Sequence, residues 1–547
     1  MSTQAAAEHS ILRSSAIMAA GTVVSRVTGF LRTAVLAFAL GTTALADAYN
    51  TANNIPNIVY ELLLGGILTS VVVPLIVRAR RRDADGGQAY EQRFLTLVTI
   101  ALFVCTVAAV AAAGPIISVY ARSFTPDQRE VAVSLAHFFI PQIFFYGVGA
   151  LAGAFLQSRG RFAAPMWTPV LNNLVVIAVG ATFLAVTHGG VSPATITPGE
   201  IRLLGIGTTA GIVVQTLTLV PSLRAVGFRL RLRADFLRIG LSEVARIGAW
   251  ILAYVLTNQL GLLVVTRLAT SAGVQARHAE LGYGAGYTPY VYAFLLFSLP
   301  HAIVAVSIIT ALLPRMSGHA DEGRLDLVRD DFSSGLRLAA VLIVPAAVGF
   351  LALGPQIAVV LFAHLRTTVP DAVFIGYVLS AFGCGLVFFS TFQLMLRVFY
   401  ALRDTRTPAL INVCSTAVNI ALDVVFFLTL PTGWIVVGLG FAYGMSYIVG
   451  AGLSGLVLRR RLGRLDGRHI AATLGKLAAA VVPGGVFAYA MGLAFTQTFG
   501  TETITSALAI VVGVAGGGLL YVLIARRLGV AELDTVTRML TRKVAAR

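Results

Sequence analysis

The sequence has very little charge for its length. Of its 547 residues, only 12% are charged and 57% are hydrophobic, whereas soluble domains carry about 25% charged residues. Apolar blocks of the length that a transmembrane helix needs fill nearly the whole chain, and the polar stretches between them are short. The chain is therefore predicted to be one integral membrane unit without a separate soluble domain.

The sequence also lacks several motifs, and their absence narrows the classes of function that are expected. The cysteines Cys105, Cys384 and Cys414 all lie in apolar blocks without paired spacing, which argues against disulfides and metal ligation. No nucleotide-binding loop of the G-x-x-x-x-G-K-[ST] type is present, so ATP is not expected to drive this chain directly. No catalytic constellation or metal-ligand cluster stands out. We predict a protein that is not an enzyme and that holds no cofactor, and we expect no removable signal peptide.

Fourteen apolar segments are long enough to cross a bilayer as helices, and each is expected to be one span. They lie at roughly 14–40, 50–77, 94–120, 131–157, 165–187, 202–222, 239–267, 289–314, 335–363, 372–400, 407–430, 434–458, 472–495 and 503–525.

The net charge of +17 lies mainly in the short loops. Arginine-rich runs such as 78–82, 229–233 and 459–464 follow even-numbered spans, and the loops after odd-numbered spans carry few cations. Positive loops face the cytoplasm and its anionic lipids. The pattern predicts that both termini are cytoplasmic and that the basic charge meets membrane lipids, with no nucleic acid partner.

Several ionisable side chains fall inside the predicted spans, where an unpartnered charge costs a few kcal/mol. Arg26 and Arg32 lie in the first span, Asp47 precedes the second, and Glu61 lies within the second. An arginine fork suits a lipid diphosphate, because it donates two parallel hydrogen bonds and keeps its charge. An equally weighted alternative is that the arginines only pair with Asp47 and Glu61 to hold helices together.

Later spans hold further polar residues. Asn57, Arg267 and Arg397 are embedded candidates, although a lone membrane asparagine more often joins helices than binds a ligand. Asp423 has no obvious partner nearby in the sequence, which makes it a candidate for proton or cation coupling.

Ordered motifs along the chain resemble those of the MurJ (MviN) lipid II flippases. The motifs are the Ser25–Arg32 segment, Ala46-Asp47-Ala48-Tyr49, Ile55-Pro56-Asn57, Gly160-Arg161-Phe162, Pro165, Pro169 and Asn172, Ala311-Leu312-Leu313-Pro314, and Arg397-Val398-Phe399-Tyr400-Ala401 followed by Asp404-Thr405 and Thr407-Pro408. The predicted number of spans also agrees with the fourteen of that family.

The resemblance implies the fold of the multidrug/oligosaccharidyl-lipid/polysaccharide exporters. It implies two six-helix lobes, 1–222 and 223–458, around a central cavity, with two added helices and a basic cytoplasmic tail in 459–547. It also implies that the protein moves lipid II, an undecaprenyl diphosphate carrying a disaccharide-pentapeptide, to the outer leaflet of the bacterial inner membrane by alternating access. It marks Arg26, Arg32 and Asp47 for substrate binding. Asn57, Glu61, Arg267 and Arg397 complete the predicted binding residues as embedded polar side chains, and Arg267 or Arg397 would replace cations that the family usually has elsewhere.

The sequence departs from the family pattern at a few positions. Tyr60 and Leu295 stand where the family usually has arginines, and Thr33 stands where it has an acid. These departures favour a second hypothesis, a flippase for another undecaprenyl-linked glycan. A cation-coupled drug exporter and a scaffold that recruits cell-wall synthesis enzymes are further alternatives. Membrane potential could drive export of an anion, since one charge across 100 mV is worth about 2.3 kcal/mol.

Overall fold

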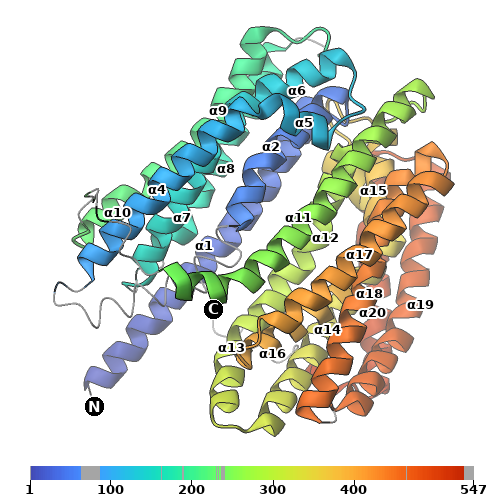
Figure 1. The fold of residues 1–547 in the computed structure, drawn as a ribbon. Coiled ribbons are helices and arrows are strands. Elements are labelled where there is room, and N and C mark those ends of the chain that lie inside the picture. Colours follow the sequence, from blue (N-terminus) through green and yellow to red (C-terminus); the bar gives the residue numbers. More distant parts are fainter. Residues whose placement is uncertain are drawn as a thin grey trace. The chain divides into compact units, whose positions relative to one another are not determined.

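The fold is described from a computed structural model. The described residues are 2–62, 85, 87–159, 161, 163–187, 190–228, 231, 233, 235, 241–463 and 465–534, and the side chains of 2–19, 59–60, 62, 241–248 and 310–311 are outside the description. The chain forms two compact units, Met1–Gln259 and Leu260–Arg547. Each unit is helical throughout its described part (Figure 1).

Unit 1 contains nine helices and the first half of a tenth among its described residues. They are α1 (Ser2–Leu40), α2 (Ala44–Leu62), α4 (Gln88–Ala111), α5 (Ala113–Tyr120), α6 (Pro126–Phe139), α7 (Gln142–Gln157), α8 (Ala163–Val186), α9 (Pro198–Leu217), α10 (Leu219–Ala225) and the start of α11 (Leu241–His278). Helix α8 packs between α1 and α9, and α6 packs against α2 and α9 (Figure 1).

Hydrogen bonds between buried polar groups fix the packing of unit 1. The Tyr49 hydroxyl of α2 is 2.9 Å from the Thr208 hydroxyl of α9, and the Tyr49 ring meets Phe139 of α6 edge-on. Thr209 of α9 donates to the carbonyl of Phe138 over 2.7 Å. Hydrogen bonds of this kind join helices in a membrane, where the apolar surface of one helix gains little by leaving lipid for another.

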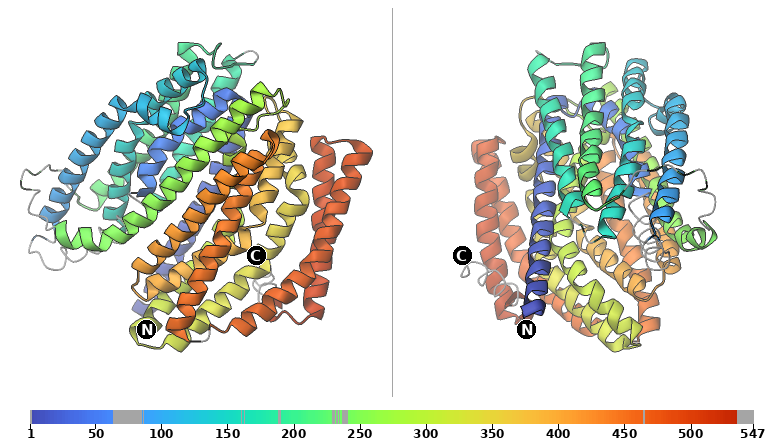
Figure 2. Two further views of the ribbon diagram at one scale, coloured as in Figure 1. Left: turned by 45° about the vertical axis from the view of Figure 1, so that its right-hand side comes forward. Right: turned by 90° about the vertical axis from the view of Figure 1, so that its left-hand side faces the viewer.

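Unit 2 holds the end of α11 and the remaining described helices. They are α12 (Tyr287–Pro300), the π-helical turn η3 (His301–Ala305), α13 (Val306–Asp321), α14 (Leu325–Phe362), α15 (Val369–Gly383), α16 (Leu386–Ala401), α17 (Arg406–Thr429), the short turn η4 (Thr432–Trp434), α18 (Ile435–Leu462), α19 (Gly467–Phe499) and α20 (Thr503–Arg527). Helices α19 and α20 run side by side and both contact α14 (Figure 2).

Two spans of unit 2 are interrupted. Helices α15 and α16 meet at a bend of 50°. The bend brings Gly385 so close to Gly444 of α18 that a Cβ on Gly385 would lie 2.1 Å from the Gly444 Cα. The second interruption is η3, which directly follows Pro300. Proline and π-helical turns bend helices where transporter backbone lines a cavity or moves.

The predicted all-α membrane fold is confirmed. Twelve helices of the described residues are long and apolar enough to cross a membrane, and the bent pair α15–α16 brings the number to thirteen if it forms one span. Each of these corresponds to one predicted segment. The other predicted segment, 50–77, begins within α2, and its part beyond Leu62 lies outside the described residues.

Candidate functional site

The turn of α1 that carries the first embedded arginine is fixed by α8. The side-chain amide of Asn173 donates to the backbone carbonyl of Ser25 over 3.1 Å and to the hydroxyl of Thr28 over 3.0 Å. Asn173 is buried, so both bonds are shielded from solvent. The contact turns one face of α1 toward α8 and leaves the Arg26 side chain exposed on another face.

The two arginines of α1 differ in their surroundings. Arg26 is exposed and Arg32 is half-buried, and neither forms an ion pair with any side chain that the structure describes. Six residues of helix turn the side-chain direction by about 600°, so the two side chains leave α1 about 120° apart. The charge of Arg32 acts on the buried Tyr49 hydroxyl of α2. The sequence placed both arginines in one span, but they do not share one face of the helix.

Two polar residues of α2 have partners other than these arginines. Asn57 donates from its amide to the Asn53 carbonyl over 2.9 Å and accepts from the Tyr146 hydroxyl over 3.3 Å. Glu61 is exposed and accepts a 2.9 Å hydrogen bond from the amide of Gln259, on α11. Asp47 is fully buried in the first turn of α2.

In unit 2, Arg397 lies in a small polar cluster around η3. Its guanidinium lies over the Tyr400 ring at 5.8 Å, and its Nε is buried without a hydrogen-bond acceptor among the described residues. The Arg397 charge also acts on His301, the first residue of η3. The His301 Nδ1 is 3.2 Å from the Ser390 hydroxyl, and its ring packs 4.7 Å from Phe389. The sequence singled out Arg397, but His301 and Ser390 were not among the predicted site residues.

Asp423 has a partner close in the sequence, and the expectation that it has none is wrong. The Asn419 amide, one helical turn earlier on α17, donates to Asp423 Oδ2 over 3.1 Å. Residues four apart on a helix are neighbours, so the pair could have been found from spacing alone. The carboxylate is fully buried, and its Oδ1 has no hydrogen-bond partner in the described part of the chain.

Asp423 is shielded from solvent and lies near a tyrosine of a neighbouring helix. Tyr290 of α12 is close enough for its hydroxyl to interact electrostatically with Asp423. On α18 the Tyr447 hydroxyl donates to the Tyr443 hydroxyl over 3.2 Å. An ionised carboxylate in such a place is expensive unless a proton or a cation accompanies it.

Arg267 is the remaining predicted site residue. It is exposed on α11, in unit 2, and its side chain forms no ion pair within the described ranges. The structure thus divides the candidate residues: Arg26, Arg32, Asp47, Asn57 and Glu61 belong to unit 1, and Arg267, Arg397 and Asp423 to unit 2.

Several charges in the loops and at the helix ends, in contrast, are paired. Arg159 binds Glu91 over 2.5 Å, and Arg461 binds Asp404 over 2.5 Å. Hydrogen bonds from Arg93 and Arg233 hold the pKa of the Asp235 carboxyl well below its usual range. Because an embedded charge is costly, the arginines without described ion pairs inside the spans are the better candidates for an anionic ligand.

The fold is that of a known class of membrane transporters. The structure described as lipid II flippase MurJ in an inward closed conformation aligns with a TM-score of 0.74 at 17% identity, covering 93% of this chain and 99% of that one. An inward-facing multidrug resistance transporter of the MATE family aligns with a TM-score of 0.63 at 16% identity, covering 81% of this chain and 96% of that one. These similarities show the fold that this chain shares with both of those proteins.

Sequence comparison identifies the family. A sequence model of the family "Lipid II flippase MurJ" matches residues 36–510. A probable lipid II flippase MurJ of Rhizobium meliloti is 26% identical, with 98% of this chain and 97% of that protein aligned. A lipid II flippase MurJ of Burkholderia cenocepacia is 27% identical, with 80% of this chain and 81% of that protein aligned. The chain belongs to the lipid II flippase MurJ family, which confirms the resemblance found in the sequence.

Proposed function

We propose that this chain moves lipid II from the cytoplasmic to the outer leaflet of the bacterial inner membrane by alternating access, as a transporter and not as an enzyme. Membership of the family over residues 36–510 is the observation that carries the proposal. The arginine-rich loops after even-numbered spans support cytoplasmic termini. Membrane lipids surround the protein, and cell-wall synthesis enzymes are partners that this function would favour.

The embedded arginines are proposed to hold the diphosphate. Arg26 and Arg267 are exposed, and Arg32 and Arg397 are half-buried, so each can reach a ligand without first breaking an ion pair to a described residue. A charge-assisted hydrogen bond to phosphate contributes about 1.5–3 kcal/mol. Two arginines that act together would therefore supply much of the headgroup affinity.

The acidic and amide side chains of α2 are proposed to bind the sugars. Glu61 is exposed and uses only one carboxylate oxygen for Gln259, and Asn57 is half-buried. Hydroxyl groups of sugars donate well to such carboxylate and amide oxygens. Asp47 is fully buried, so its contact with the substrate would require α2 to move.

The experiment that tests the function is depletion of the protein in its host, followed by a leaflet-specific assay of lipid II exposed at the outer surface. We expect loss of outer lipid II, accumulation inside and lysis. Complementation with Arg26→Ala should fail although the variant inserts normally, because the exposed guanidinium is lost without disturbing the Asn173 contacts of α1. Full complementation by folded Arg26→Ala would remove Arg26 from the site.

Transport is proposed to be coupled to a proton or cation bound at Asp423 and to the membrane potential. The support is a fully buried carboxylate with one oxygen lacking a hydrogen bond among the described residues. A proton or a monovalent cation would satisfy that oxygen. Asp423→Asn keeps the shape and removes the charge, so in proteoliposomes it should abolish the dependence of transport on the coupling ion. Transport by this variant that still follows the ion gradient would exclude the site.

A flippase for another undecaprenyl-linked glycan remains the second candidate. The observation that favours it is an apolar Leu295 on α12 at a position where the family usually has arginine. Depletion that leaves outer lipid II unchanged but reduces another exported glycan would select this alternative.

A further inference from the structure

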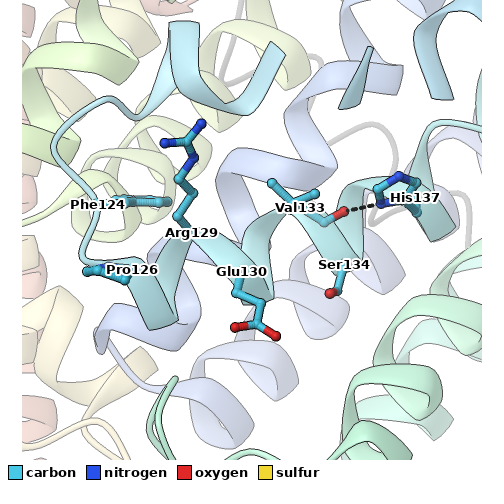
Figure 3. Close-up of a pocket in the computed structure, with 7 residues that line it drawn as sticks. All are labelled: Phe124, Pro126, Arg129, Glu130, Val133, Ser134 and His137. Carbon is cyan, nitrogen blue, oxygen red and sulfur yellow. Dashed lines mark hydrogen bonds between the residues drawn. The ribbon is translucent and has the colours of Figure 1, made fainter. Parts of the chain in front are cut away.

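Unit 1 has a hollow on α6, lined by both apolar and polar side chains, that none of the roles above uses (Figure 3). The hollow has a volume of about 480 Å³. Phe124 and Pro126 lie at one end, and Arg129, Glu130, Ser134 and His137 line its length. All of these residues belong to α6 or to the loop that leads into it.

The polar stripe extends deep into a membrane-length helical segment. His137 lies eleven residues after Pro126, in the segment Pro126–Gln157 that is long and apolar enough to span, which places it about 16 Å further along the helix. Arg129, Glu130 and His137 are exposed, whereas Leu135 and Phe139 are fully buried. An ionisable side chain at the depth of His137 is costly in lipid and almost always faces the protein interior or a water-filled cavity.

Several hydrogen-bonding groups of the stripe are available to a ligand. Arg129 donates to the Ser118 hydroxyl of α5 with one nitrogen, which leaves its other donors free to bind. The His137 Nδ1 is 2.8 Å from the Val133 carbonyl, so its Nε2 remains (Figure 3). Within the described residues, the Glu130 carboxylate and the Ser134 hydroxyl have no hydrogen-bond partner.

The lining favours a ligand with charges of both signs. Arg129 binds a carboxylate, but the neighbouring Glu130 repels a diphosphate and accepts from an amine or an amide N–H. From Arg129 to His137 the stripe runs eight residues, about 12 Å, which matches three to four residues of extended peptide at about 3.3–3.6 Å each. A phospholipid headgroup is shorter and would leave the Ser134–His137 end empty.

We propose that this hollow binds the peptide arm of the translocated headgroup, with Arg129 on a carboxylate and Glu130 on an amine or amide. The proposal rests on the proposed function, because it assigns a second binding site for the same substrate. Diphosphate recognition by the embedded arginines and peptide recognition by α6 are then separate contributions to affinity.

The test measures dissociation constants of the purified full chain in nanodiscs for two ligands: lipid II, and the same undecaprenyl-diphosphate disaccharide without its peptide. Arg129→Gln and Glu130→Gln should each raise Kd for lipid II about threefold to fivefold, the effect of an exposed charge pair, and leave Kd for the peptide-free lipid unchanged. Arg122→Gln and Asp127→Asn are the matched controls, since both residues are exposed near the hollow but do not line it. Ser134→Leu fills the hollow without changing charge. It should also raise Kd for lipid II, and it replaces either charge variant that folds poorly.

Each of the other outcomes would overturn either the proposal for the hollow or the proposed function. Equal losses for both lipids, or for vesicles of anionic phospholipid, would assign the hollow to phosphate groups and overturn the proposal. Variants of the hollow that match their controls for lipid II would overturn it as well, while the embedded-arginine site stands. Wild-type protein that binds neither undecaprenyl lipid would overturn the proposed function itself, so the two failures are distinguishable.

Discussion

The ion pair between Glu91 of α4 and Arg159, just after α7, should dominate the stability of that end of unit 1. Its atoms are 2.5 Å apart, and the side chains are 0% and 9% exposed. Arg159 also donates to the Phe155 carbonyl over 3.0 Å and lies 5.5 Å over the Phe228 ring. Glu91→Gln keeps the size of the side chain but leaves the buried guanidinium without its counter-charge, which destabilises a protein by about 3–5 kcal/mol.

This loss is large enough to measure in detergent. At about 2 °C per kcal/mol, the lower end for large domains, the apparent Tm should fall by about 6–10 °C. Arg93→Gln is the control, because the Arg93–Asp235 pair is similarly short at 2.6 Å but is 25% and 32% exposed. An exposed pair contributes about 0–1 kcal/mol, so its Tm should change by less than about 2 °C. Removal of both partners in Glu91→Gln/Arg159→Gln should recover part of the loss. The reasoning is refuted if Glu91→Gln and Arg93→Gln have the same Tm.

Two further predictions concern the bent span and the arginine site. Gly385→Ala should lower Tm, because its Cβ would lie 2.1 Å from the Gly444 Cα, an overlap of the kind that costs about 1–3 kcal/mol. Gly452→Ala, with nothing within 4 Å of its Cβ, should be neutral or stabilising, and equal effects of the two substitutions would contradict the close approach. Arg32→Lys keeps the charge but loses the planar fork, so lipid II transport in proteoliposomes should fall about tenfold; an unchanged rate would show that only charge matters there.

The helices could be predicted from the sequence because hydrophobic length alone decides whether a segment can cross a bilayer. The interruptions of the helices could not be predicted from the sequence. The bend between α15 and α16 depends on Gly385 meeting Gly444, residues from different spans whose approach no local pattern reports. Pro300 marks a weak point in its span, but the π-helical turn that follows it at His301 depends on packing against α14 and α16.

The site was predictable in residue type but not in geometry. Arginines are so costly inside a membrane that their presence in a span already indicates a role. The direction of each arginine side chain depends on which face of its helix is buried. For Arg26, the hydrogen bond from Asn173 of α8 fixes the face of α1 that packs against α8. The partner of Glu61 is Gln259, 198 positions away, which no spacing rule could supply. The hydrogen bond between Asn419 and Asp423, in contrast, follows the ordinary four-residue spacing of a helix and is predictable from the sequence.

Within unit 2, the packing also shows how a buried ion could influence an anion site without touching it. Asp423 and Tyr447 both lie near Tyr290 of α12. The Tyr447 ring packs 5.0 Å from Phe389, and the Phe389 ring also packs 4.7 Å from the His301 ring. Packed rings therefore connect the surroundings of Asp423 with the Arg397 cluster and with a π-helical turn that has a less regular hydrogen-bond pattern than an α-helix. Coupling of this kind requires two arrangements of the rings that differ in energy with the charge of Asp423. The proposed coupling thus places the conformational change in α12 and η3, and it does not require a direct contact between ion and lipid.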